Sequence, residues 1–222
     1  MAWRRFGTGA AAAMAYIAAA ALSWPSSGLV LYDAFWPALP YRWVHPPAET
    51  AKDNQPAQAD SGVVPLGQLG LSQPRVVQTQ DAQMQVTFPA GVVAIQSGAT
   101  SVRVTIIPLD PSRGARPPTG LLIEGNLYRV EARYAPSGEP VALAGPVTVV
   151  IRYPRHAEAV LHSAGAGWAV LRATRYPGTL QVLANSDELG VFAAATPGGR
   201  ALPEWLPYAA AAGANGRDAA GT

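Results

Sequence analysis

Three histidines are the residues of this chain best suited to acid–base or metal chemistry, but their spacing favours neither. The sequence of 222 residues contains His45, His156 and His162, and it contains no cysteine. A protein zinc site needs three or four converging ligands, and Glu158 is the only carboxylate near His156 and His162 in the sequence. We therefore expect all three histidines to be surface residues and predict no metal ligand.

Serine nucleophiles are not supported by their sequence context. A catalytic triad would need Ser137 or Ser163 together with a distant base, and neither serine lies in a Gly-x-Ser-x-Gly turn. His162 and Ser163 are neighbours, so on a strand their side chains point to opposite faces and do not pair directly. We predict no catalytic residue among them.

Four acidic residues stand in predicted turns, where Asp and Glu are common. They are Asp81, Asp110, Glu124 and Asp187. Glycoside hydrolysis needs two facing carboxyl groups roughly 5 to 9.5 Å apart, and calcium loops of the EF-hand type need a ligand spacing that this sequence lacks. We expect these residues to be structural, with no cofactor bound.

Residues 164–170 are interpreted as a turn that leads into a strand. Gly165 and Gly167 precede Trp168, but no βα unit comes before them, so the segment does not resemble a nucleotide-binding loop. We expect Trp168 to be a core residue. The alternative is an exposed aromatic platform for a sugar or a peptide.

The first 36 residues are predicted to direct the chain to a membrane. Arg4 and Arg5 precede an uncharged run from Phe6 to Tyr32, and about 20 apolar residues suffice to span a bilayer. This order is typical of a signal anchor or a cleaved signal peptide. We expect a single-pass protein of the cell membrane with its C-terminal domain extracytoplasmic, or a secreted protein if the signal is cleaved.

Composition divides the remainder of the chain. Residues 37–74 contain seven prolines and little periodicity, which predicts an extended stalk. Within it, residues 40–47 hold Trp43 and Val44 in a context too apolar for a pure linker, which leaves open that this part packs. Residues 196–222 are expected to form a flexible tail. The 16 basic residues leave a net charge of +2 and are scattered along the chain, so no nucleic-acid partner is expected.

Residues 75–195 contain short runs in which apolar and polar side chains alternate. In the clearest run Tyr128 and Val130 are expected to point inward, and Arg129 and Arg133 to point to solvent. The expected strands cover residues 83–88, 101–106, 127–134, 146–153, 167–172, 179–184 and 190–194. Period two with one polar face, and turns between the runs, predict an all-β fold. We expect an antiparallel β-sandwich of about eight or nine strands, preceded by the apolar helix and the Pro-rich stalk.

Five segments, "VTFPAGVV", "VRVTIIPLDP", "YAPSGEPVALAGPVTVVIRYP", "GWAVLR" and "LGVFA", together resemble a ZU5-type β-sandwich over about residues 75–195. The resemblance implies a module that is mostly non-enzymatic and serves protein interaction in larger assemblies. Some members of the family cleave themselves at a His-Phe-Ser near the last strand. Phe192 matches that Phe, but Val191 and Ala193 replace the His and the Ser, so self-cleavage is not implied.

These features predict a membrane-tethered, extracytoplasmic module for protein interaction or structural assembly, and not an enzyme. The expected partners are the membrane, through the N-terminal helix, and another envelope or surface protein. Two alternatives stay open. One is an envelope carbohydrate-binding protein or hydrolase that uses loops at one end of the sandwich, and the other is an accessory subunit of a larger membrane complex.

Overall fold

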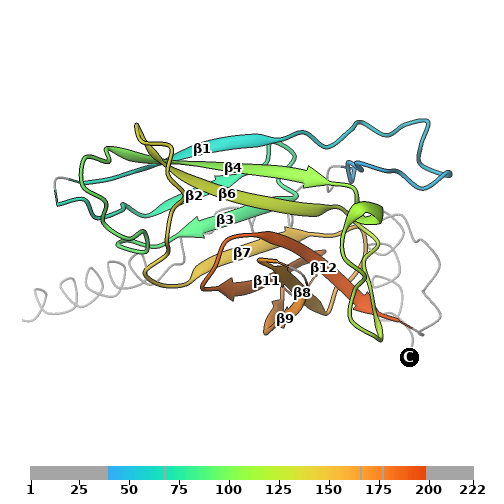
Figure 1. Cartoon of the computed structure of the whole chain (residues 1–222). Coiled ribbons are helices and arrows are strands. Elements are labelled where there is room, and N and C mark those ends of the chain that lie inside the picture. The colour runs from blue at the N-terminus through green and yellow to red at the C-terminus, as the bar shows by residue number, and fades with distance from the viewer. Residues whose placement is uncertain (1–39, 68, 166, 177, 199–222) are drawn as a thin grey trace, which may run out of the picture. The chain divides into compact units, whose positions relative to one another are not determined.

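Two antiparallel β-sheets packed as a sandwich make up the described part of the chain (Figure 1). The computed structural model describes residues 40–67, 69–165, 167–176 and 178–198. The predicted anchor or signal, residues 1–36, lies outside these residues, as does almost all of the predicted tail. No helix in the described ranges has both the length and the apolar character needed to cross a membrane.

The larger sheet has seven strands in the order β1-β4-β6-β12-β8-β9, with β5 paired to β12. Their bounds are β1 Asp60–Pro65, β4 Ser101–Leu109, β5 Leu121–Leu122, β6 Leu127–Ala135, β8 Ala159–Ser163, β9 Ala169–Leu171 and β12 Val191–Pro197. The long pair β4–β6 is in register from Ser101 opposite Ala135 to Leu109 opposite Leu127. In Figure 1 this pair lies beside β1 in the upper half of the view.

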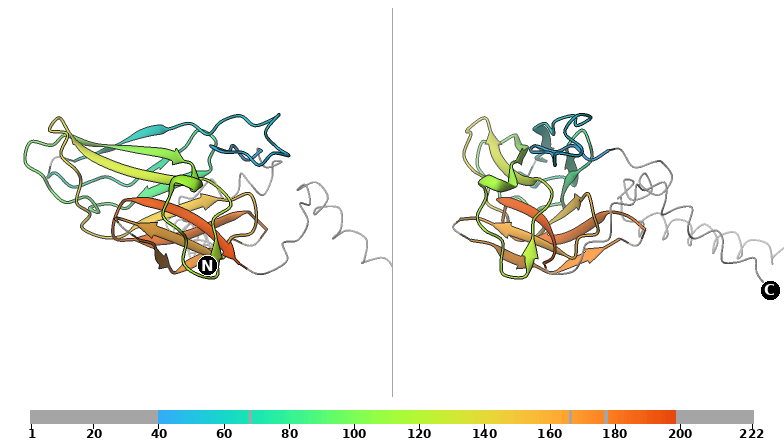
Figure 2. Two further views of the ribbon diagram at one scale, coloured as in Figure 1. Left: turned by 45° about the vertical axis from the view of Figure 1, so that its right-hand side comes forward. Right: turned by 90° about the vertical axis from the view of Figure 1, so that its right-hand side faces the viewer.

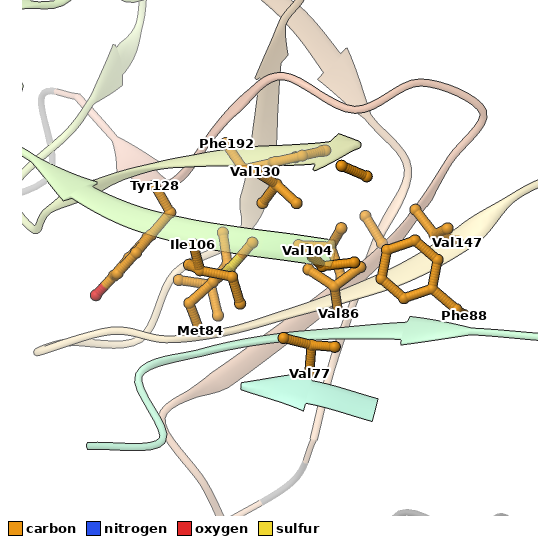
Figure 3. Packing of buried hydrophobic residues seen from close by; sticks show 14 of the residues in the cluster. Val77, Met84, Val86, Phe88, Val104, Ile106, Tyr128, Val130, Val147 and Phe192 are labelled. Atoms are coloured by element: carbon orange, nitrogen blue, oxygen red, sulfur yellow. The ribbon is translucent and has the colours of Figure 1, made fainter. Parts of the chain in front are cut away.

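The smaller sheet has five strands in the order β10-β11-β7-β3-β2. Their bounds are β2 Arg75–Gln78, β3 Met84–Phe88, β7 Val147–Arg152, β10 Ala173–Arg175 and β11 Gln181–Ser186. Apolar side chains from both sheets meet between them, including Val86 from β3 and Val104, Tyr128 and Val130 from β4 and β6 (Figure 3). The expected inward faces of β3, β6 and β7 are confirmed by the burial of their alternate residues.

The described residues form twelve strands, against the expected eight or nine. The difference comes partly from β5 and β10, which have two and three residues and are too short to show a period of two. A second apolar cluster, which includes Leu161, Ala193 and Ala195, lies outside the main core and packs with Leu121 and Ile123. Strand β12 is therefore buried on both faces, and it lacks the alternation of a half-exposed strand.

Part of the expected stalk, residues 37–74, belongs to the sandwich instead. Strand β1 pairs with β4 from Asp60 opposite Ile106 to Pro65 opposite Ser101, and Val64 and Trp43 are buried. The sequence pattern did not predict β1, because its residues, DSGVVP, include two adjacent apolar residues and show no alternation. The sandwich therefore begins well before Arg75.

The sandwich has two distinct ends, which the left view of Figure 2 separates. At one, called here the Tyr41 end, residues 41–54 lie beside the turns that lead into β3 and β6. Strand β12 also finishes at this end, because it runs antiparallel to β6. The opposite end, called here the loop tip, consists of residues 69–74, 89–100 and 136–146. Residues 40 and 198 thus both lie away from the loop tip.

Candidate functional site

A groove of about 820 Å³ lies beside β6 on the larger sheet. Arg129, Glu131 and Arg133, the outward-pointing residues of β6, line it together with the backbone of the residues between them. Its remaining sides are formed by residues 140–143, 163–165 and 187–191. The groove is thus assembled from four segments that are distant in sequence.

The groove opens where β6 changes its neighbour. Strand β12 pairs with β6 through two residues, Val191 opposite Arg129 and Phe192 opposite Tyr128. The Val130 N–H then donates to the Gly190 carbonyl at 2.8 Å. Beyond this point β6 bonds instead to residues 139–141, since the Val141 N–H donates to the Ala132 carbonyl at 3.0 Å. The two neighbouring segments separate here and leave the outward side chains of β6 open.

Charges of both signs surround the groove. Arg129 and Glu131 approach to 4.0 Å, and both side chains are about half exposed. Asp187 and Glu188 are exposed on one wall. Val141, Leu143 and Leu189 add partly buried apolar surface. Apolar patches with a charged border are the usual composition of protein–protein contact surfaces.

The Tyr41 end is a second polar region, and there side-chain amides bind the backbone of residues 42–44. The Gln83 Oε1 accepts from the Arg42 N–H at 2.6 Å, and its Nε2 donates to the Arg42 carbonyl at 3.0 Å. The Asn126 Oδ1 accepts from the Val44 N–H at 2.8 Å, and its Nδ2 donates to the Arg42 carbonyl at 2.8 Å. The two side-chain amides thus supply the hydrogen bonds to the backbone that a neighbouring strand supplies within a sheet.

Three tyrosines meet at this end: Tyr128 and Tyr153 are buried, and Tyr41, from the segment itself, is half-buried. Burial raises the pKa of Tyr128 to about 12. Burial, and then the neighbouring Tyr128, raise the pKa of Tyr41 well above its ordinary value. Burial also raises the pKa of Tyr153, whose hydroxyl oxygen accepts from the Gly125 N–H at 2.9 Å. All three phenols stay neutral near neutral pH and act as hydrogen-bonding core residues.

The histidines are placed differently from one another. His45 and His156 are exposed, as expected. The expectation is wrong for His162, which is 7% exposed. It lies opposite Phe192 in the β8–β12 register, with ring centroids 4.8 Å apart. The two-residue period of β8 puts it on the same side as the core residue Val160.

The predicted acidic residues take part in local structure. The Asp81 Oδ1 accepts from the Thr79 hydroxyl at 2.6 Å. Asp110 caps the 3-10 turn Pro111–Arg113. Glu124 pairs with Arg155 at 3.1 Å. Asp187 lies at the groove. Across the described ranges, no three His, Asp or Glu side chains gather in a way that would hold a metal ion.

The remaining candidates also have local partners. The Ser163 hydroxyl donates to the Gly165 carbonyl at 3.0 Å, and the Ser137 hydroxyl oxygen accepts from the Glu139 N–H at 3.3 Å. Trp168 is half-buried rather than a core residue, and its Nε1 donates to the Ala115 carbonyl at 2.9 Å. It packs at the margin of the second cluster, because the turn that precedes β9 holds it at an edge of the sheet.

Gln83 and Asn126 were not identified as important from the sequence. The alternation of residues 83–88 places Gln83 on the polar side of that run, yet it is fully buried because residues 41–54 cover it. Single Gln and Asn residues are ordinary surface components, so composition offered no signal for either.

Comparison with known proteins adds no relative. No model of a known protein family matches the chain, and no curated protein matches it. The described residues form an all-β domain of two antiparallel sheets.

Proposed function

We propose that this protein is a membrane-tethered, extracytoplasmic β-sandwich module of the ZU5 type, which serves protein interaction or structural assembly and is not an enzyme. The observation that carries the proposal is the groove beside β6, with its mixture of apolar surface and charges of both signs. The resemblance of residues 75–195 to ZU5-type modules, which mostly serve protein interaction, supports the same assignment.

The partner that suits this groove is an extended segment of another envelope or surface protein. Val141 and Leu143 offer apolar surface that such a segment can cover. Arg133 on one side and Asp187 on the other offer opposite charges, which select the orientation of a partner more than they add affinity.

The proposed membrane attachment is inferred from the sequence that precedes the described residues. The basic pair and the uncharged run to Tyr32 are typical of a signal anchor. The chain that follows is tied to the sandwich by Gln83 and Asn126.

Site-specific photocrosslinking in cells tests the function. A photoreactive amino acid at Ala142, an exposed groove residue, is expected to form one discrete adduct with an envelope protein. The double variant Glu131→Arg/Asp187→Arg is expected to abolish that adduct. The control variant Arg172→Glu changes an exposed charge outside the groove and is expected to leave the adduct unchanged. An adduct that survives the double reversal would show that the groove is not the contact surface.

A further inference from the structure

The loop tip exposes large apolar side chains in an uncharged surrounding. Leu69, Leu71 and Ile95 are 79%, 47% and 64% exposed. The connections 66–74, 89–100 and 136–146 contain one charged residue, Glu139, and its carboxylate accepts from the Gln96 side-chain amide. Clustered exposed apolar side chains usually mark a surface that binds something.

These side chains are held outward by a defined structure. Gly70 has a φ of +73°, and a Cβ at this position would approach the Ile95 Cγ2 to 3.0 Å. The Gly91 N–H donates to the Ser72 carbonyl at 2.8 Å, and the Gly67 N–H donates to the Leu71 carbonyl at 2.8 Å. The two connections thus support each other and present Leu71 and Ile95 at the same end of the sandwich.

Three arginines lie near the loop tip, on the strands that its connections join. Arg103 and Arg133 are exposed and stand directly opposite each other on β4 and β6, and Arg75 is exposed at the start of β2. Arg103 and Arg133 lie two residues from the strand ends, which is about 7 Å at the rise of a strand. Like charges directly opposite each other destabilise a sheet. In the part of the chain that the structure describes, none of the three arginines forms an ion pair.

We infer that the loop tip inserts into an anionic lipid surface. Leu69, Leu71 and Ile95 enter the boundary between headgroups and acyl chains, a layer that amphipathic protein surfaces penetrate by about 5 to 10 Å. Arg75, Arg103 and Arg133 then stand at the depth of the headgroups, where anionic lipids attract them. The groove carries charges of both signs, as a protein contact does, whereas the three arginines beside the loop tip carry one sign, which favours an anionic lipid surface. This inference goes beyond the proposed function; of its three arginines, Arg133 also lines the groove, whereas Arg75 and Arg103 do not.

A fluorophore at the tip gives a direct test, because the chain contains no cysteine and a single one can be labelled. The full chain with Ile95→Cys is labelled with the fluorophore NBD, placed in phosphatidylcholine nanodiscs, and mixed with vesicles of phosphatidylcholine and phosphatidylglycerol. We expect a blue shift and a several-fold rise in emission, with quenching by brominated lipid. The control Val170→Cys, on β9 and similarly exposed, is expected to show no change.

Charge variants test the arginine layer separately. Arg75→Gln with Arg103→Gln is expected to raise the vesicle concentration needed for half-maximal response several-fold, whereas Arg172→Gln leaves it unchanged. Neither tip arginine lines the groove, so a failure here is distinguishable from a failure of the proposed function. Emission that stays constant with vesicles, or that changes with protein concentration alone, would overturn the inference. An equal response to pure phosphatidylcholine vesicles would overturn it as well.

Discussion

Replacing Gln83 by Ala is expected to lower the free energy of unfolding by about 3 to 4 kcal/mol. Gln83 is fully buried, and its amide makes three hydrogen bonds, two to the backbone of Arg42 and one to the Tyr128 hydroxyl at 3.0 Å. Truncation leaves the Arg42 N–H without this acceptor, which costs about 1–3 kcal/mol, and each further lost bond costs about 1 kcal/mol. The Arg42 carbonyl keeps its bond from Asn126, which limits the total.

Gln85→Ala is the matched control, because Gln85 is a glutamine on β3, two residues beyond Gln83. Gln85 is also buried, but within the described residues its amide makes one hydrogen bond, to the Thr87 hydroxyl at 3.3 Å. We expect a loss of about 1 kcal/mol or less. Urea unfolding followed by circular dichroism measures both variants. Gln83→Leu keeps most of the side-chain volume and should remain clearly destabilised. If it were as stable as the parent, or if both alanine variants lost the same amount, the hydrogen bonds to Arg42 would not be what stabilises this end.

Three further predictions concern the core and its boundaries. The fragment 75–195 should melt at a lower temperature than the fragment 40–198, because it lacks β1 and the cover over Gln83; equal thermal transitions would contradict this. Stability should be complete below pH 10 and should fall as the pH rises through the Tyr128 pKa of about 12, by about 3 kcal/mol for a shift of this size; ultraviolet absorbance should show tyrosines that ionise only on unfolding. Val130→Asp should destabilise the fold severely because it buries an unpaired charge. Arg129→Asp should change the free energy of unfolding by about 0.5 kcal/mol or less. Similar urea midpoints for the two variants would refute the assignment of inward and outward residues on β6.

The sequence predicted those strands that bury one face. In β6 the alternation of Tyr128 and Val130 with charged neighbours is sufficient to assign both the strand and its orientation. The sequence could not predict β1, because the side chains of β1 do not alternate and prolines lie around this strand. It also could not show β12 as a central strand, since packing on both of its sides replaces alternation by a run of small apolar residues.

The candidate surfaces depend on contacts between distant segments, which one-dimensional patterns do not contain. The groove arises because β6 exchanges Gly190 for Val141 as its neighbour, and nothing local to either residue indicates this. The burial of His162 follows from its position opposite Phe192. In contrast, the expectation that Arg129 and Arg133 face solvent depended on period two alone, and it is confirmed.

The direction of β1 determines how this domain responds to tension. Strand β1 runs from the Tyr41 end toward the loop tip and is held to β4 through six residue pairs. A force that pulls residue 40 away from the loop tip acts along β1, so it shears these pairs together instead of opening them one by one. The bonds from Gln83 and Asn126 come before this clamp along the chain and yield first. Their release frees residues 41–54, which span at most about 46 to 50 Å when fully extended, so the domain lengthens under load before its sheets begin to separate.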